Sequence, residues 1–495
     1  MKLAAADIYQ LYQPVRCNLR ARLNKLETSP QKADAFTELL RDLGKRYEAD
    51  HLKTFPAHLD ISDGDFEQRS RDTIAAVSRG EDVIYQGVLF AGRESIGEED
   101  SIVGIPDLLI KEGDSYVVRD CKLARHLGPH PEVLRQLELY GWLYEQTFGS
   151  PPARLEVLLG DGSLQDIPYD GGASALAVLD EIKQLATMPE APYEPVGWSK
   201  CGDCAFHDTC WPAAERRQDV ALVPGVDQGL ARHLHELGID TYSQLLASYT
   251  VESLSETKRQ QVSQLRKVGS VARKAMLHAQ ALAEGRTIHM GRFPFTLGRD
   301  YVMFDLEGIP SQVDEVEKIY MWGMQVFGPS QSPYRPALAT LGPDGDATGW
   351  FRFLDEANDI FQAHGDIPFV HWAVYEKTMI NKYINRYGDP LGIAQRVLDN
   401  LVDLLPITQD TVVLPDPSYS LKVVELRAGF HRGMEEYGGS WSIARYIRAV
   451  EAGDEAVYKE TMDDILQYNR EDLEATWAVF TWLANNFGHE PGATA

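Results

Sequence analysis

Two aspartates and a lysine are spaced in a way that can build a hydrolytic metal site. Asp107 follows the apolar run IVGIP, and Asp120 and Lys122 end a second apolar segment, which gives the pattern PD-x12-D-x-K. Side chains alternate along a strand, so Asp120 and Lys122 point to the same side. Divalent cations prefer carboxylate oxygens, and they lower the pKa of a water molecule that they bind. We therefore expect metal-dependent hydrolysis here, with Lys122 orienting the water or stabilising charge on a phosphate.

Further polar side chains of this region are predicted to lie on helices. Gln136 and Tyr140, in the segment QLELY, are one helical turn apart and face one side, so we expect both at the same site. Glu48 is a candidate for a further metal ligand, with His51 as its competitor and an ordinary solvated helix face as the alternative.

Three of the five cysteines, Cys201, Cys204 and Cys210, have the spacing C-x2-C-x5-C. We expect a cytoplasmic protein, because the N-terminus lacks a signal-peptide pattern and no apolar run approaches the roughly 18 residues of a membrane span. Clustered thiols in a reducing compartment indicate a metal or cluster site rather than disulfides. His207, which lies between Cys204 and Cys210, would complete a zinc site as the fourth ligand.

A second group of acidic residues lies towards the C-terminus. Asp305 and Glu307 alternate onto one face of the apolar strand predicted around YVMFDLEG, where unpaired acids would be costly. Tyr468 and Asp472 form a Y-x3-D pair, one turn apart on a helix. Acids gathered in this way can hold two metal ions that clamp the attacking and leaving oxygens of a phosphodiester, with Tyr468 positioning the water.

The elements that must position these residues form an α/β chain of several domains. Its 495 residues, 44% hydrophobic and 25% charged, suffice for about three domains of roughly 150 residues. The formal net charge of −26 argues against nucleic-acid binding over the whole surface, so any such site must be locally basic or bridged by divalent metal. The chain has no G-x4-G-K-[ST] motif, and we expect no ATP motor in it.

The middle of the chain is predicted to be a helical connector. Residues 221–248 indicate two short helices about the turn Pro224–Gly225, similar to a helix-hairpin-helix element, whose amides approach a phosphate. Asp227 stands where that motif usually carries a second glycine, and its carboxylate would repel a phosphate. Residues 255–286, predicted to be mainly helical, form the most basic window of the protein. Either a phosphate-binding surface or a solvated interdomain connector fits these features.

The segments PD-x12-D-x-K and QLELY resemble the PD-(D/E)xK nuclease superfamily, in particular its RecB-like branch with a Q-x3-Y motif. The resemblance extends over about residues 1–215. It implies that Asp107 and Asp120, with Glu48, hold Mg²⁺ or Mn²⁺ while Lys122 assists hydrolysis.

In the iron-sulfur members of that family, one cysteine near the N-terminus joins three cysteines beyond the nuclease core. Cys17 occupies the matching place here, and Cys201, Cys204 and Cys210 have the family's spacing. The resemblance therefore implies a structural 4Fe-4S cluster held by these four cysteines, with zinc and His207 as the alternative.

The C-terminal part resembles the RNase H-like superfamily, in its DEDD exonuclease branch with polarity 3′ to 5′. Asp305 and Glu307 match the first motif, and the Y-x3-D pair that ends at Asp472 matches the third. The second motif differs from that of the family, which commonly has N-x3-F-D, whereas this chain has H-x3-Y-E ending at Glu376. Glutamate is a plausible ligand with a longer reach, and Asp403, in LVDLLP, is a candidate to substitute or assist.

The order of parts resembles a family of predicted bacterial RecB-like nucleases. It comprises a nuclease domain at residues 1–215, a helix-hairpin-helix-like connector at 216–290 and an exonuclease domain at 291–495. The resemblance implies a metal-dependent nuclease with two active centres that cleaves DNA, single-stranded or with an end, in repair, recombination or defence against foreign DNA. A separately encoded helicase is a possible partner. The alternatives are one active centre, an RNA substrate, or a scaffold that recruits a helicase or recombinase.

Overall fold

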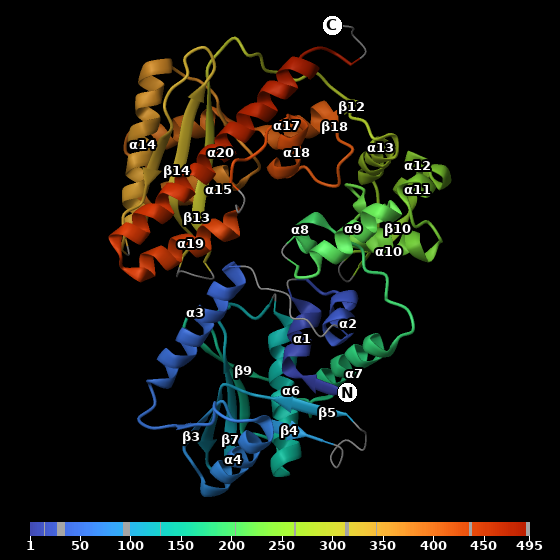
Figure 1. Cartoon of the computed structure of the whole chain (residues 1–495), viewed down its shortest axis with the longest axis vertical. Coiled ribbons are helices and arrows are strands. Elements are labelled where there is room, and N and C mark those ends of the chain that lie inside the picture. Colours follow the sequence, from blue (N-terminus) through green and yellow to red (C-terminus); the bar gives the residue numbers. More distant parts are fainter. Residues whose placement is uncertain are drawn as a thin grey trace. The chain divides into compact units, whose positions relative to one another are not determined.

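The chain forms two compact units of helices and mixed sheets, which confirms the predicted α/β class (Figure 1). The first unit covers most of residues 1–210 and the second most of residues 211–495. The division into three domains, with boundaries near 215 and 290, stays a prediction. The computed structural model describes residues 1–13, 15–26, 35–92, 100–128, 130–202, 204–261, 264–311, 316–342, 344–434 and 438–491.

The first unit contains a six-stranded sheet of order β2-β3-β6-β7-β8-β9 and a three-stranded sheet of order β1-β5-β4. Its strands are β1 (Lys2–Ala4), β2 (Leu59–Asp60), β3 (Val83–Tyr85), β4 (Leu89–Ala91), β5 (Ser101–Gly104), β6 (Leu108–Glu112), β7 (Ser115–Cys121), β8 (Arg154–Leu158) and β9 (Leu164–Ile167). Its helices are α1 (Ala5–Tyr12), α2 (Asn18–Leu26), α3 (Ala35–Leu52), α4 (Phe66–Arg79), α6 (Pro131–Phe148) and α7 (Ala173–Thr187), and α8 (Trp198–Cys201) and α9 (His207–Arg217) lie at the boundary between the units.

The core of the first unit holds the candidate catalytic strand in place. Leu137 and Leu143 of α6 share one apolar cluster with Val118 of β7, and these side chains are fully buried. Strand β7 pairs with β6 in an antiparallel ladder in which Leu108 lies opposite Arg119. The residues immediately before β6 therefore come next to the carboxyl end of β7, which is where the PD and D-x-K segments meet.

The second unit begins with the region predicted as a connector. It comprises the 3₁₀ helix η1 (Val220–Leu222), α10 (Gln228–Glu236), α11 (Tyr242–Ser248), α12 (Val251–Glu256), β10 (Lys258–Gln261), β11 (Gln264–Lys267) and α13 (Val271–Glu284). Two expectations were wrong: both short helices follow the Pro224–Gly225 turn, with η1 before it, and a β-hairpin rather than a helix forms the first part of residues 255–286. The hairpin packs on α10, since Arg259 of β10 pairs with Asp227, and this long-range contact overrides the local sequence pattern.

The rest of the second unit is built on a five-stranded sheet of order β15-β14-β13-β16-β17. Its strands are β12 (Ile288–His289), β13 (Tyr301–Ile309), β14 (Lys318–Phe327), β15 (Arg335–Leu338), β16 (Phe369–His371), β17 (Leu401–Asp403) and β18 (Val412–Val413). Its helices are α14 (Gly345–His364), α15 (Tyr375–Tyr387), α16 (Ile393–Asp399), α17 (Leu404–Thr411), α18 (Leu421–Arg427), α19 (Gly439–Ala452) and α20 (Glu455–Phe487).

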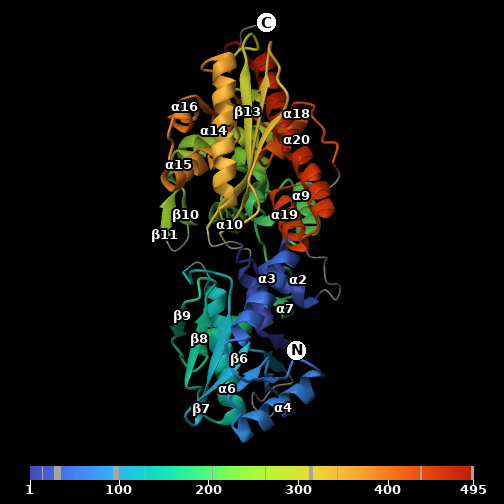
Figure 2. The ribbon, with the colours of Figure 1, turned by 90° about the vertical axis from the view of Figure 1, so that its left-hand side faces the viewer.

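Helices α14 and α20 cover opposite faces of this sheet (Figures 1 and 2). Phe304 of β13 packs with Phe353 of α14, whereas Tyr301 and Met303 share a cluster with Phe480 of α20. Alternation along β13 therefore places its next odd-numbered side chains on the α20 face. Within the described part of the chain, no helix combines the length and apolarity that a membrane span requires.

Candidate active sites

The PD and D-x-K residues meet at the carboxyl end of β7. Asp107 Oδ2 accepts a hydrogen bond from the backbone N–H of Cys121 at 2.7 Å, and Lys122 Nζ lies 2.5 Å from Asp120 Oδ2. Asp107 and Asp120 are buried, with 7% and 2% of their surface exposed. The strand pairing thus brings together two carboxylates and a lysine that the sequence proposed as one site.

Negative charge accumulates at this site. Burial, and then the charge of Asp120, raises the pKa of Asp107 well above its ordinary value. Burial and Asp120 also raise the pKa of Glu48, which α3 brings to the same group. Burial lowers the pKa of Lys122, but the carboxylates of Asp120 and Asp107 outweigh that effect and raise it. A divalent cation would relieve the repulsion among these acids.

Gln86 joins two of these acids and was missed in the sequence. Its φ of 57° lies in the left-handed region, which is uncommon for residues other than glycine. Its backbone N–H donates to the carbonyl oxygen of Asp107 at 2.9 Å. Its side-chain Nε2 lies 3.2 Å from Asp107 Oδ1 and 3.4 Å from Glu48 Oε2. Gln86 directly follows the short strand β3, and no sequence pattern around it would have revealed this role.

The Q-x3-Y pair lies close to the same acids. Gln136 Nε2 donates to the hydroxyl of Tyr140 at 2.7 Å across one turn of α6. Burial, and then the charges of Asp120 and Asp107, raise the pKa of Tyr140 well above its ordinary value. His51, the competitor of Glu48, instead has Nε2 3.1 Å from a guanidinium nitrogen of Arg119.

The cysteines proposed as cluster ligands all lie in the described part of the chain, and none forms a disulfide. Burial raises the pKa of Cys17 to about 11, and the charges of Glu194 and Cys204 make smaller contributions to that rise. The backbone N–H of Cys204 donates to the carbonyl oxygen of Cys201 at 3.1 Å. His207 Nδ1 lies 2.9 Å from that same oxygen. Cys210 lies in α9, at its fourth residue.

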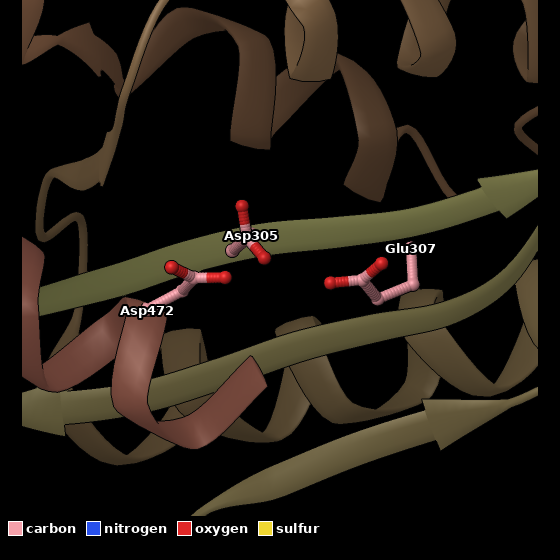
Figure 3. A group of neighbouring side chains, drawn as sticks. All are labelled: Asp305, Glu307 and Asp472. Carbon is pink, nitrogen blue, oxygen red and sulfur yellow. The ribbon is translucent and has the colours of Figure 1, made fainter. Parts of the chain in front are cut away.

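In the second unit, Asp305 and Glu307 of β13 face Asp472 of α20 (Figure 3). One oxygen of each carboxylate lies within 4.8 Å of the other two. Among the described residues, no other set of three or more histidines, cysteines and acids comes this close together. The cysteines and the acids of the first unit are therefore more widely spaced than this triad.

The triad holds its protons more tightly than isolated carboxyl groups would. Burial, and then Asp472 and Glu307, raise the pKa of Asp305 well above its ordinary value. Burial, and then Asp472, raise the pKa of Glu307 to about 8. Burial raises the pKa of Asp472 against the opposing effect of Arg432, which donates to Asp472 Oδ1 at 2.6 Å and to the two oxygens of Glu425 at 2.8 Å.

Asn469 fixes the position of Asp305 and was also missed. Its Nδ2 donates to Asp305 Oδ2 at 2.7 Å, and its Oδ1 accepts from the hydroxyl of Tyr334 at 2.8 Å. Gly323 lies opposite Asp305 in the β13–β14 ladder, and a Cβ there would lie 1.8 Å from Asn469 Oδ1. Asn469 stands three residues before Asp472 on the same helical face, so this spacing could have identified it.

Three further side chains surround the triad. Ser442 Oγ donates to Glu307 Oε2 at 2.7 Å, and the hydroxyl of Tyr320 contacts both groups. Tyr468 lies one turn before Asp472 on α20, and burial, followed by the charge of Asp472, raises its pKa well above the ordinary value.

The two remaining candidate ligands are engaged by other groups. Glu376 Oε2 lies 2.9 Å from His371 Nδ1, and both side chains are buried. The charge of Glu376 nevertheless contributes to the raised pKa of Asp305. Asp403 Oδ1 accepts from the backbone N–H groups of Ala373 and Leu405, at 3.0 Å each, and thereby caps α17. Neither acid is part of the closely spaced triad.

Two family models match this chain. Residues 4–211 match the PD-(D/E)XK nuclease superfamily, and residues 302–484 match the RNase H superfamily. The chain therefore joins a PD-(D/E)XK nuclease domain to an RNase H-like domain, which confirms the predicted two-domain resemblance, and both domains support a nuclease acting on nucleic acid.

Other comparisons are more distant. No curated protein matches the chain. A solved structure, the crystal structure of SSO0001, is 17% identical over 36% of this chain and 97% of its own, with a TM-score of 0.20.

Proposed function

We propose that the protein is a divalent-metal-dependent nuclease that hydrolyses DNA phosphodiester bonds at two centres. The observation that carries the proposal is the triad Asp305, Glu307 and Asp472, whose ligand atoms lie within 4.8 Å of one another inside an RNase H-like domain. The group formed by Asp107, Asp120 and Lys122 within the PD-(D/E)XK domain supports the second centre.

Both sites fit Mg²⁺ or Mn²⁺, because they offer buried carboxylate oxygens whose pKa values are raised first by burial and then by the charges of the neighbouring acids. A bound divalent ion would lower the pKa of the attacking water and stabilise charge on the phosphate. At the first centre Lys122 would stabilise the developing charge. At the second, Tyr468 would position the water, and Asn469 would hold Asp305 in place. A 3′ to 5′ polarity for this second centre is part of the proposal.

The cysteines support a structural 4Fe-4S cluster in the first domain. Four thiolates are the usual ligands of such a cluster. The electrostatic interaction of Cys17 with Cys204 favours a site that includes the N-terminal cysteine. The zinc alternative would use His207 and leave Cys17 out. Anaerobic purification followed by iron, sulfide and zinc analysis of wild type and Cys17→Ala distinguishes them: loss of about four irons supports the cluster, and zinc retained by the variant refutes it.

Cleavage of labelled DNA in Mg²⁺ and in Mn²⁺ tests the two centres. We expect Asp120→Asn and Asp305→Asn each to abolish one part of the activity and the double variant to be inactive. Complete loss through either single change would contradict two independent centres. Undiminished cleavage by the double variant would refute both sites.

We place the activity in the cytoplasm, in DNA repair, recombination or defence, with a separately encoded helicase as partner. RNA is the second candidate substrate, because metal-assisted phosphodiester hydrolysis does not itself read the sugar. Parallel assays on DNA and RNA strands of the same sequence decide between them.

A further inference from the structure

The N-terminus of α10, where a helix-hairpin-helix element would approach a phosphate, is already occupied. Asp227 caps this helix by accepting from the backbone N–H of Leu230 at 2.9 Å, and it pairs with Arg259 at 2.6 Å. The carbonyl oxygen of Gln260 packs so closely on Gly229 that a Cβ there would lie 1.8 Å from it. Gly229 thus allows the β10–β11 hairpin to pack closely on α10, and the Asp227 carboxylate occupies the helix N-terminus where a phosphate would bind.

The β10–β11 hairpin carries cations in an arrangement that costs stability. Lys258 lies directly opposite Lys267, and Arg259 directly opposite Arg266, so two successive cross-strand pairs have like charges. Such pairs are destabilising in a sheet. Arg259 is buried and neutralised by Asp227, and Lys267 contacts Glu256. Among the described residues, Lys258 and Arg266 pair with no acidic side chain, and Arg266 donates to Gln264 Oε1 at 3.2 Å.

The hairpin presents these cations to solvent. Lys258, Arg266 and Lys267 are exposed. Leu265 lies opposite Gln260, on the face of the ribbon that carries the Lys258–Lys267 pair, and is 64% exposed. Exposed glutamines, Gln260 among them, complete the surface. Cations, amide groups and one apolar side chain on a two-stranded ribbon match the phosphates, base edges and sugar faces of a nucleic acid.

We propose that the β10–β11 hairpin binds the sugar-phosphate backbone of nucleic acid through Lys258, Arg266 and Lys267 (Figure 2). This inference rests on the proposed nuclease function and adds a surface that holds the substrate outside the catalytic carboxylates. In a chain of net charge −26, a local cationic ribbon supplies an attraction for phosphates that opposes the repulsion by the net charge.

The test is fluorescence anisotropy with labelled single-stranded DNA, duplex DNA and single-stranded RNA, in EDTA, so that cleavage does not interfere. The protein carries Asp120→Asn and Asp305→Asn, and it is compared with and without Lys258→Gln, Arg266→Gln and Lys267→Gln. A matched control removes three exposed, ion-paired cations elsewhere; it carries Arg79→Gln, Lys382→Gln and Arg396→Gln.

We expect the hairpin variant to bind about tenfold more weakly near 0.1 M salt, and its plot of log affinity against log salt to be shallower by about two units. The control should change affinity by less than about threefold, because only its net charge is altered. The proposal is overturned if the hairpin and control variants lose the same amount of nucleic-acid affinity, or if the hairpin variant loses none.

Two controls separate this result from other failures. Thermal unfolding should show the hairpin variant at least as stable as the parent, because like-charge pairs are removed; a large loss of stability would refute the cross-strand argument. A raised KM for DNA in a cleavage-competent protein that carries the three hairpin changes, with the KM of the control variant unchanged, supports the hairpin. Hairpin-dependent binding by a wild-type protein that cleaves nothing would refute the proposed function and leave the binding surface standing.

Discussion

Gly323→Ala, on β14 opposite Asp305 of β13, should disturb the site formed by Asp305, Glu307 and Asp472. The added Cβ would lie 1.8 Å from Asn469 Oδ1 and 2.8 Å from its Cγ. A non-bonded contact needs more than 3 Å, so Asn469 must move by roughly 1 Å or more. That movement breaks its 2.7 Å bond to Asp305 and its 2.8 Å bond with Tyr334.

The cost follows from these contacts. Overpacking costs about 1–3 kcal/mol, and leaving buried polar groups unpaired costs about 1–3 kcal/mol, so a total of about 3 kcal/mol is expected. For a domain of this size that corresponds to a Tm lower by roughly 6–12 °C. In an Asp120→Asn background, where only the second centre is intact, a 1 Å displacement of Asp305 should lower kcat on the order of 100-fold.

A double variant separates packing from positioning. Gly323→Ala combined with Asn469→Ala gives the new methyl group room, so calorimetry should show a Tm near that of Asn469→Ala alone. Activity should stay low, because Asp305 lacks its donor. Additive losses of stability in the double variant, or a wild-type Tm for Gly323→Ala, would refute the steric argument.

Three further predictions concern buried polar groups. Gln86→Glu places a third carboxylate beside Glu48 and Asp107, so the Tm of the metal-free protein should fall. The increase in Tm on adding Mn²⁺ should be larger in this variant than in wild type; an equal increase in both proteins would contradict this. Burial, with Lys274, lowers the pKa of His278 to about 4 from 6.5, so the unfolded state binds more protons between these values. Stability should fall by up to about 3 kcal/mol as pH decreases through that window, and His278→Phe should remove this part of the loss in thermal unfolding at pH 7 and 4.5. Arg432→Gln leaves Glu425, which is 1% exposed, without its cation, and should cost about 3–5 kcal/mol, largely restored by adding Glu425→Gln; an unrestored Tm would argue against the ion pair.

The sequence predicted the fold best where one periodicity extended over a whole element. Strand β13 follows from its apolar run YVMF with Asp305 and Glu307 alternating after it, and α6 from its helical pattern closed by Pro131 and Gly149. The helix predicted for the first part of residues 255–286 was wrong, because this segment forms the β10–β11 hairpin. A contact with Asp227, about thirty residues earlier, determines the structure there, and local patterns carry no information about it.

The candidate-site residues likewise divide into those that a sequence motif predicts and those that only the fold brings to the site. Asp107, Asp120 and the triad residues belong to motifs whose spacing states which side chains share a face. Gln86 and Arg432 come from loops and meet the acids only through the fold, so no spacing points to them. Glu376 was a motif-based candidate, yet its environment is set by His371, which shows that a motif places a residue near a site without fixing its partner.

The two centres differ in how they balance negative charge without metal. Lys122 is two residues from its partner Asp120, and its flexible side chain is 26% exposed. Arg432 is held by both oxygens of Glu425 while it contacts Asp472, and its side chain is only 2% exposed. If the proposed metal sites exist, a cation bound in the first would compete with the Lys122 ammonium group for Asp120, and one bound in the second would share Asp472 with the Arg432 guanidinium. Because a fixed positive charge beside a ligand weakens cation binding, the closely spaced triad would compensate for Arg432 in the second site.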